Sequence, residues 1–277
     1  MGVENDQTYS HTTYNTDMAI NWTLERVEES SSTNEDLMSR WRQNLLLEPV
    51  ARLAIKQTAG KGRLGRSWLS LPGQTLTFSV AYPFQKNIAE LSGLSLACGL
   101  AIINGISEAS GLSKETLRNL GLRLKWPNDL LLHQNKLAGM LIEGGQIRAG
   151  EPTWLIIGIG INLLPNLDIE KLIGRKMASL SELGLKNNLD IDLLFLSLIR
   201  NLGESIQLFE KKSFADFKDE WNSWDAFQNQ VCEIYQNTSL QKSGLNQGVD
   251  SCGQLLLKTA TGLETIISGD ISLKVKA

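Results

Sequence analysis

The segment from residue 57 to residue 68 constrains the fold most strongly, because it interleaves glycines with cations between two strand-like segments. Glycine lets the backbone adopt positive φ and approach a ligand closely, and arginine can bind phosphate or carboxylate oxygens in pairs. The segment contains three glycines, three cations and a closing aromatic residue: Gly60, Lys61, Gly62, Arg63, Gly65, Arg66 and Trp68. It predicts a loop that is mobile when empty and becomes ordered around a phosphate-bearing ligand. A solvated charged face is the simpler alternative, although interleaved glycines would be costly there.

Two familiar nucleotide-binding motifs are excluded by what surrounds the glycines. A P-loop must open a helix, whereas residues 74–82 alternate polar and apolar side chains as a half-buried strand does. Gly158 and Gly160 also follow a strand, but the third glycine of a Rossmann motif is missing. Pro165 stands where the Rossmann helix should run.

Charge and residue counts exclude further classes of protein. The 277-residue chain can form one large and one small domain, and its net charge of −3 makes the cations of residues 61–66 a local site, not a nucleic-acid surface. The two histidines, His11 and His133, and three widely spaced cysteines argue against a histidine-based triad or a metal cluster. No apolar run has membrane-spanning length and no signal peptide is recognisable, so we expect a cytoplasmic protein.

The order of the expected elements predicts an α+β main domain, because strands and helices mix without regular βαβ alternation. A helix is expected to begin at Ser32 or Thr33, with Glu35 closing a capping box. Its apolar face would carry Leu37, Trp41 and Leu45. The other expected elements are strands at 21–27, 50–56, 74–82, 122–132 (with a turn at 127–129), 136–143 and 154–162, a helix at 88–110, a connector at 111–120, a helix at 190–209, and a helix carrying Phe214, Phe217 and Trp221.

Three regions follow from this pattern. Residues 1–20 are polar and lack hydrophobic periodicity, which predicts a flexible tail. Residues 21–226 form the main domain. From residue 227 the sequence changes to short strands broken by glycine turns, at 231–235, 255–258 and 271–275, which predicts a small β-barrel-like domain over 227–277.

Five motifs, in this order and spacing, resemble the biotin protein ligase family. They are Ser32-Thr33-Asn34, Gln57 with residues 59–66 and Trp68, Lys125-Trp-Pro-Asn-Asp129, Lys136-Leu-Ala-Gly139, and Gly158-Ile-Gly-Ile-Asn162. The resemblance covers residues 22–277. It implies a mixed β-sheet flanked by helices, related to the class II aminoacyl-tRNA synthetases, followed by an SH3-like C-terminal domain. Twenty polar N-terminal residues cannot form the DNA-binding domain that many members carry, so a repressor role is not expected.

The resemblance also implies roles for individual residues. Lys136 and Arg63 would be catalytic, and Asp129 would support Mg²⁺. The implied biotin-binding residues are Ser32, Thr33, Asn34, Gln57, Lys61, Gly62, Arg63, Lys136, Gly158 and Gly160. The implied residues for ATP and the adenylate are Lys61, Arg63, Arg66, Trp68, Asn128, Lys136 and Asn162. Two positions depart from the family pattern: Lys61 stands where arginine is usual, and Ile159 stands where a smaller residue is common.

The implied activity is ATP-dependent activation of biotin to biotinyl-5′-AMP. Biotin would then be transferred to one lysine of the biotin carboxyl carrier protein of acetyl-CoA carboxylase. An exposed edge of the main sheet is expected to serve a homodimer or the carrier. Two alternatives stay open at this point: a lipoate–protein ligase, although the paired arginines and glycine triplet of that family are absent, and a non-enzymatic biotin- or nucleotide-binding regulator.

Overall fold

A seven-stranded mixed sheet forms the centre of the protein. The computed structural model describes residues 18–184, 190–236, 238–267 and 271–275. The strand order is β1-β2-β5-β9-β8-β7-β6; β1 and β2 are parallel and the remaining neighbours in this sheet are antiparallel. The strands are β1 (Thr23–Ser30), β2 (Val50–Gln57), β5 (Thr75–Phe84), β6 (Leu122–Lys125), β7 (Asp129–Leu132), β8 (Asn135–Gly145) and β9 (Thr153–Asn162).

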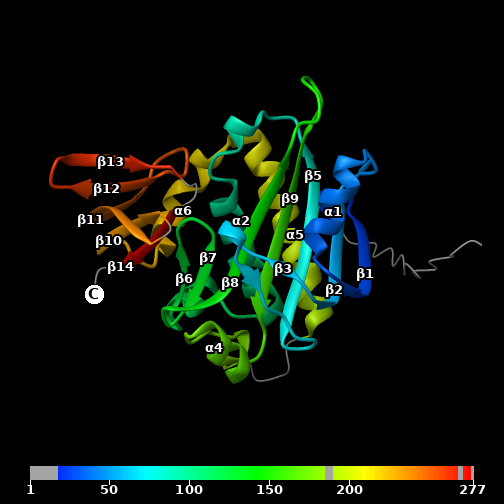
Figure 1. Ribbon diagram of the computed structural model, residues 1–277, viewed down its shortest axis with the longest axis horizontal. Coiled ribbons are helices and arrows are strands. Elements are labelled where there is room, and N and C mark those ends of the chain that lie inside the picture. Colours follow the sequence, from blue (N-terminus) through cyan, green and yellow to red (C-terminus); the bar gives the residue numbers. More distant parts are fainter. Residues whose placement is uncertain (1–17, 185–189, 237, 268–270, 276–277) are drawn as a thin grey trace, which may run out of the picture.

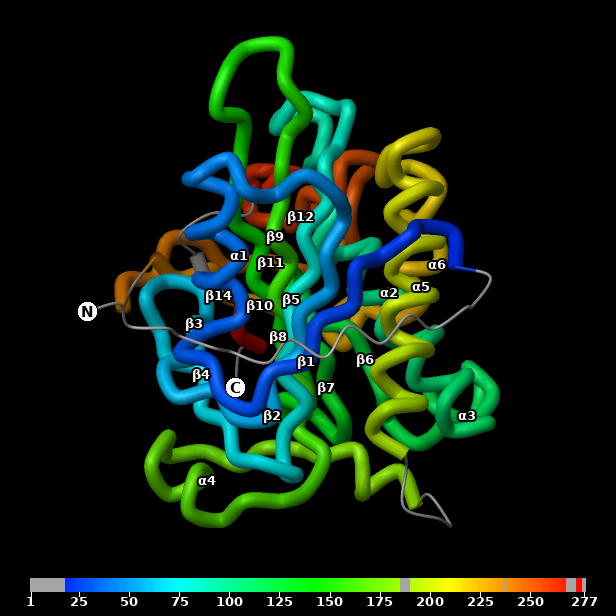
Figure 2. Tube along the Cα trace, turned by 90° about the vertical axis from the view of Figure 1, so that its right-hand side faces the viewer, coloured from blue at the N-terminus to red at the C-terminus, as the bar shows by residue number. Residues whose placement is uncertain are grey.

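Helices cover both faces of this sheet (Figure 1; Figure 2). Figure 2 shows the sheet with α1 (Thr33–Arg42) on one side and α2 (Leu94–Ser110) and α5 (Ile191–Lys212) on the other. Successive side chains of a strand point to opposite faces, so β5 serves both sides. Its apolar residues Leu76, Phe78 and Val80 join the core beneath α2 and α5. On the α1 side, the Ser79 hydroxyl lies within hydrogen-bonding distance of Thr33 and Asn34.

A second, five-stranded antiparallel sheet lies beside the first, with strand order β13-β12-β11-β10-β14. Its strands are β10 (Val231–Gln236), β11 (Ser239–Val249), β12 (Leu255–Thr259), β13 (Gly262–Ile266) and β14 (Ile271–Val275). The two parts share one hydrophobic core, to which the second sheet contributes Cys232, Leu257 and Leu273. The indole Nε1 of Trp126 donates to the Gly253 carbonyl at 3.0 Å, which joins the two parts directly.

The α+β fold with a small C-terminal β domain was predicted correctly, and several local predictions need correction. The helix expected at 88–110 is interrupted at Gly93, whose φ of +84° separates a 3₁₀ turn (Ile88–Leu91) from α2. The expected connector contains α3 (Lys114–Asn119). Leu45 lies beyond the end of α1 and is 58% exposed, so it does not extend the apolar face of that helix.

Other elements were not predicted at all. They are β11, β13, α4 (Leu167–Ile173) and the hairpin of β3 (Gly60–Lys61) and β4 (Ser67–Trp68). The helix expected around Phe214 is a 3₁₀ turn (Phe214–Phe217) that continues into α6 (Lys218–Trp224). The expected tail over 1–20 lies outside the described residues up to residue 17, and Ile20 is buried in the core. None of the described helices is both long and apolar enough to cross a membrane.

Gly93 and Gly111 provide a matched pair that tests packing at the start of α2. Both have positive φ, +84° and +70°, so alanine at either position costs about 1–2 kcal/mol in backbone strain. A Cβ at Gly93 would lie 2.6 Å from Cγ of Phe214, whereas a Cβ at Gly111 meets no atom within 4 Å. We expect Gly93→Ala to lower the free energy of unfolding by about 1–3 kcal/mol more than Gly111→Ala, measured by chemical denaturation. Equal losses would contradict this packing.

Candidate active site

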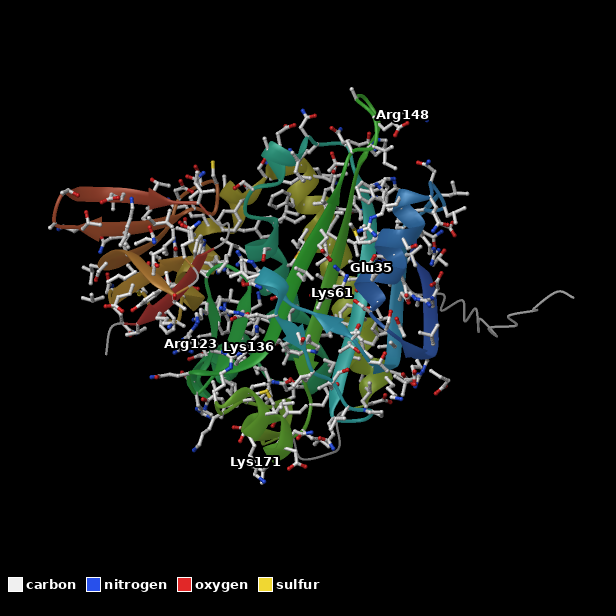
Figure 3. The ribbon with its side chains drawn as sticks, viewed as in Figure 1. Glu35, Lys61, Arg123, Lys136, Arg148 and Lys171 are labelled. Atoms are coloured by element: carbon white, nitrogen blue, oxygen red, sulfur yellow. The ribbon has the colours of Figure 1, made fainter. Side chains whose placement is uncertain are left out.

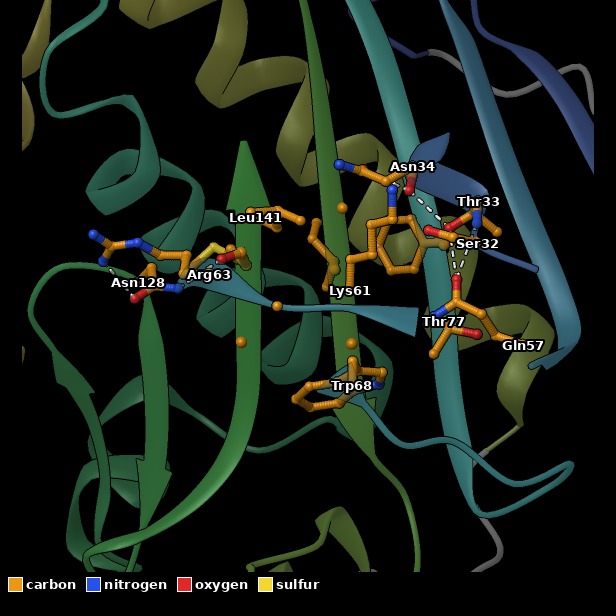
Figure 4. A pocket seen from close by; sticks show the side chains of 18 of the residues that line it. Ser32, Thr33, Asn34, Gln57, Lys61, Arg63, Trp68, Thr77, Asn128 and Leu141 are labelled. Carbon is orange, nitrogen blue, oxygen red and sulfur yellow. Dashed lines mark hydrogen bonds between the residues drawn. The ribbon is translucent and has the colours of Figure 1, made fainter. Parts of the chain in front are cut away.

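The N-terminus of α1 holds a cluster of buried polar side chains (Figure 4). Ser32 caps the helix and accepts from the Glu35 amide at 3.4 Å. The amide and hydroxyl of Thr33 donate to Oε1 of Gln57, at 3.0 and 3.3 Å. The Ser79 hydroxyl donates to Oδ1 of Asn34 at 3.0 Å. These hydrogen bonds fix a set of small polar groups at one end of a cavity.

This first cavity encloses about 450 Å³ of empty space, including its open mouth. Two glycines of β9 line it, and each makes room for a neighbouring side chain. A Cβ at Gly158 would lie 2.5 Å from Oδ1 of Asn34, and a Cβ at Gly160 would lie 2.3 Å from the Trp68 ring. Ile159, between them, also lines the cavity, as does Met140, and both are buried at its base within the hydrophobic core.

The glycine–cation segment is a short β-hairpin that borders the cavity. Gly60 pairs with Trp68 and Lys61 with Ser67, and the Gly62 amide donates to the Arg66 carbonyl at 2.7 Å. At Gly60 a Cβ would lie 2.4 Å from Nε2 of Gln57, so only glycine fits there without displacing Gln57. The hairpin reaches from the first cavity to a second one, since Gly62, Arg63 and Trp68 line both.

Lys136 also lines both cavities and stands at their junction. Its ammonium lies 2.6 Å from Oδ1 of Asp129 and 5.6 Å from the centre of the Trp68 ring. A Cβ at Gly139 would lie 2.7 Å from the Lys136 ammonium, so that glycine gives the lysine its space. The ion pair is mostly shielded from solvent, with 23% and 19% of the two side chains exposed.

The second cavity encloses about 1010 Å³, including open solvent, and combines cations with apolar side chains. Its charged lining residues are Arg63, Arg66, Lys125, Asp129, Lys136 and Arg175. Its apolar lining includes Ile169 and Ile173 of α4, Met177, and Leu273 of the C-terminal sheet. A cavity with an apolar wall and several cations suits a ligand with an aromatic base and phosphates.

Two asparagines brace the junction. Asn128 donates to the Met140 carbonyl at 2.6 Å and accepts from Nη1 of Arg63 at 3.2 Å. Asn162 donates to the carbonyls of Lys136 and Ala178, at 3.2 and 3.0 Å. Both side chains therefore hold the backbone around the cavities, and Asn128 also orients a predicted catalytic residue.

Lys61 and Arg66 each line only one of the two cavities, unlike Arg63 and Lys136, which line both. The Lys61 ammonium lies 2.6 Å from Oε2 of Glu35 (Figure 3). Lys61 also lines the first cavity. Hydrogen bonds from Lys61 and then Arg42 hold the pKa of Glu35 below its usual range. The capping box expected at Glu35 is therefore wrong, because its carboxylate faces these cations. Arg66 is exposed and lines the second cavity only.

The residues that line the two cavities could hold a magnesium ion that is bound together with a nucleotide. They do not form a metal centre of their own among the described residues. Within the described parts of the chain, no three His, Cys, Asp or Glu side chains gather as a metal site. Asp129 is the one carboxylate among the described residues that line either cavity. Mg²⁺ commonly binds one or two carboxylates together with substrate phosphates and water, so a single aspartate suffices for that arrangement.

Sequence reasoning missed several lining residues. Thr77 and Ser79 belong to the polar face of β5, and the alternation of residues 74–82 carried that signal. Lys125 was recognised as part of a motif but given no role. Arg175 and Leu273 offered no local signal, because they approach the cavity from a loop and from the C-terminal sheet.

Comparison with known proteins identifies the family. Residues 26–162 match the biotin/lipoate A/B protein ligase family, and residues 239–274 match the biotin protein ligase C-terminal domain. The bifunctional ligase/repressor BirA of Escherichia coli is 33% identical over 246 residues, which cover 88% of this chain and 71% of BirA. The biotin–[acetyl-CoA-carboxylase] ligase of Mycobacterium tuberculosis is 33% identical over 141 residues, half of this chain and 49% of that protein.

A solved structure agrees with these relatives. The biotin protein ligase from Aquifex aeolicus in complex with biotin and ATP is similar with a TM-score of 0.74 and 28% identity, over 91% of this chain and 99% of that one. The chain therefore belongs to the biotin/lipoate A/B protein ligase family and, within it, to the biotin protein ligases. The predicted family and fold class are confirmed.

The Lys61–Glu35 ion pair can be tested by titration. Lys61→Gln removes the largest cause of the lowered Glu35 pKa, so that pKa should rise, but only in part because Arg42 still donates. Residue-resolved NMR titration of the carboxyl groups measures it. Because the folded pKa is lowered, the stabilisation is present above the ordinary carboxyl pKa and is lost as pH falls through the lowered value.

Lys56→Gln is the control for this titration. It removes another half-exposed lysine, whose carboxylate partner is Glu29 at 2.6 Å, and should leave the Glu35 pKa unchanged. If Lys61→Gln leaves the Glu35 pKa where it was, the ion pair does not form in solution.

Proposed function

We propose that the protein activates biotin with ATP and transfers it to a lysine of a biotin carboxyl carrier protein, that of acetyl-CoA carboxylase. One observation carries the proposal: a polar cavity and a cation-rich cavity meet at Lys136 and Arg63. The names of the relatives support it, since one is a biotin–[acetyl-CoA-carboxylase] ligase and a similar structure holds biotin and ATP.

In the proposed arrangement biotin occupies the first cavity and ATP the second. The small polar groups of Thr33, Asn34 and Gln57 suit the ring of biotin, and Ser32 lines the same end of the cavity. The carboxylate of biotin would then point to Lys136, where the two cavities meet. This order brings the carboxylate and the α-phosphate of ATP to the same pair of cations.

The first proposed step joins two anions, so its barrier depends on positive charge. A carboxylate oxygen of biotin attacks the α-phosphorus, a new P–O bond forms, and the bond to the β-phosphate breaks with release of pyrophosphate. Lys136 and Arg63 stabilise the charge that develops on the oxygens around that phosphorus. No protein nucleophile is needed, which agrees with the absence of a histidine-based triad among the described residues.

In the second proposed step the ε-amine of the carrier lysine attacks the acyl carbon of the adenylate. An amide bond forms, the acyl–phosphate C–O bond breaks, AMP leaves and the amine loses its proton. The adenylate is a reactive anhydride that water must not reach before the carrier arrives. The hairpin of β3 and β4 borders both cavities, and we infer that it shields the adenylate.

Mg²⁺ is part of the proposal as a companion of ATP. Asp129 and the phosphates would hold it, and when bound it neutralises phosphate charge. Asp129 has a second function on this view, since it also holds Lys136 at the junction.

A lipoate–protein ligase belongs to the same family, and one observation separates the two activities. Residues 239–274 match the C-terminal domain of biotin protein ligases, and Leu273 of that domain lines the second cavity. This favours biotin over lipoate. We also infer a cytoplasmic enzyme that does not bind nucleic acid, consistent with the net charge of −3, and a homodimer or carrier contact at the β1 edge of the main sheet.

Exchange of labelled pyrophosphate into ATP tests the proposed function. The purified protein should catalyse exchange that requires biotin and is not supported by lipoate. Lipoate-dependent exchange would identify the alternative ligase, and biotin binding without exchange would indicate a regulator.

Lys136→Met sharpens this test. Loss of the ammonium at the junction should lower the exchange rate by at least about a hundredfold, because it removes charge stabilisation from the transition state. Lys114→Met is the matched control, since Lys114 also forms a carboxylate ion pair, with Glu220 at 2.8 Å, but lies outside both cavities. Near-normal exchange by a folded Lys136→Met protein would remove Lys136 from the reaction.

A further inference from the structure

Glu143 is a carboxylate that stands beside the first cavity without lining it. It lies on β8, two residues beyond Leu141, which does line the cavity and faces the same side of the sheet. Oε2 of Glu143 accepts from Nδ2 of Asn34 at 2.6 Å, and among the described residues Glu143 forms no ion pair. Across the sheet it pairs with Ile156, which packs with Leu37 of α1. The carboxylate is therefore placed between the cavity and the apolar packing of α1, and it contacts a residue of the cavity wall.

Glu143 determines which way the amide of Asn34 is turned. A carboxylate accepts hydrogen bonds and donates none, so the atom of Asn34 that faces it must be the donor, Nδ2. Oδ1 of Asn34 is then the atom to which the Ser79 hydroxyl donates, at 3.0 Å. Asn34 and Ser79 are both buried, so each depends on the partners that the protein supplies. The charge of Glu143 thus gives the Asn34 amide a single orientation.

This orientation fixes the direction of the next hydrogen bond, between Ser79 and Thr33. Their hydroxyl oxygens lie 2.7 Å apart, so one of them must donate to the other. The one proton of Ser79 goes to Asn34, which makes Thr33 the donor. The Thr33 proton is therefore directed toward Oγ of Ser79 and Oε1 of Gln57, at 2.7 and 3.3 Å (Figure 4). Because Thr33 lines the cavity, its oxygen faces a ligand as an acceptor and not as a donor.

We propose that Glu143 is a positioning residue that sets the direction of this hydrogen-bond chain, so that the Thr33 hydroxyl accepts from a ring N–H of biotin. The inference rests on the proposed function and adds a determinant of ligand specificity that lies outside the cavity. The cyclic urea of biotin carries two N–H donors, and a fixed acceptor discriminates strongly against a ring that lacks the matching donor. A hydroxyl free to turn would meet a ring oxygen almost as well as a ring N–H.

A pair of matched ligands tests the direction of the chain. The ligands are biotin and its two cyclic carbamates, in each of which one ring N–H is replaced by oxygen, and calorimetry measures their dissociation constants. The unsubstituted protein should bind one of the carbamates roughly ten- to hundredfold more weakly than biotin, because an oxygen then faces the Thr33 acceptor. Glu143→Gln should reduce this ratio at least about fivefold, because glutamine can also donate to Asn34 and allows the chain to reverse. A purely structural role of Glu143 would weaken both ligands equally.

Two further variants serve this experiment. Glu210→Gln is the matched control, since Glu210 is also half-buried and accepts from a neutral donor, the Gln85 amide at 2.9 Å, but lies outside both cavities. It should leave the ratio unchanged. Ser79→Ala interrupts the chain between Asn34 and Thr33, so it should lower the ratio as well. Adding Glu143→Gln to Ser79→Ala should then change the ratio no further, since the two substitutions act on one chain.

Kinetics separates this inference from the proposed function. In pyrophosphate exchange, Glu143→Gln should raise KM for biotin and leave kcat within about twofold, since Glu143 lines neither cavity. An unchanged ratio in a folded Glu143→Gln protein would overturn the inference, as would equal binding of biotin and both carbamates by the unsubstituted protein. Biotin binding without exchange would overturn the proposed function alone, and the ratio would still decide the role of Glu143. Failure of the unsubstituted protein to bind biotin would overturn both.

Discussion

The ion pair of Lys136 with Asp129, 2.6 Å apart, is the interaction on which the site depends. It holds a cation at the one place where the two cavities meet. Gly139 leaves space for the lysine, Asn162 holds its backbone carbonyl, and the Trp68 ring lies 5.6 Å from its ammonium. Because the pair is mostly shielded from solvent, its charges act more strongly than they would in water.

The alternation of side chains along the central strands lets one sheet support both the cavity and the core. On β9, Gly158 and Gly160 line the first cavity, while Ile157 and Ile161 pack into the core beneath α2 and α5. A shift of register by one residue would exchange these faces and destroy both. The packing of the core side of the sheet therefore fixes the positions of the residues that line the cavity.

Much of this arrangement could be predicted from the sequence, and the remainder depends on distant parts of the chain. The motifs around Lys136 and Asn128 drew attention to residues that line both cavities, because each motif is continuous in the sequence. The partner of Lys61 was not predictable, since Glu35 approaches it from a different element and a capping role was locally plausible. Arg175 and Leu273 reach the second cavity only through the tertiary fold. Local sequence patterns thus predict which residues belong to a site better than they predict the ion-pair partners and lining residues that distant segments supply.

The most direct test of the account is a crystal structure of the protein after incubation with biotin and ATP. We expect one bound adenylate that spans both cavities, with biotin beside Asn34, the nucleotide beside Ile169, and the acyl phosphate within hydrogen-bonding reach of Lys136 and Arg63. An adenylate bound elsewhere, or bound with Lys136 still paired to Asp129 and out of reach of the phosphate, would contradict it.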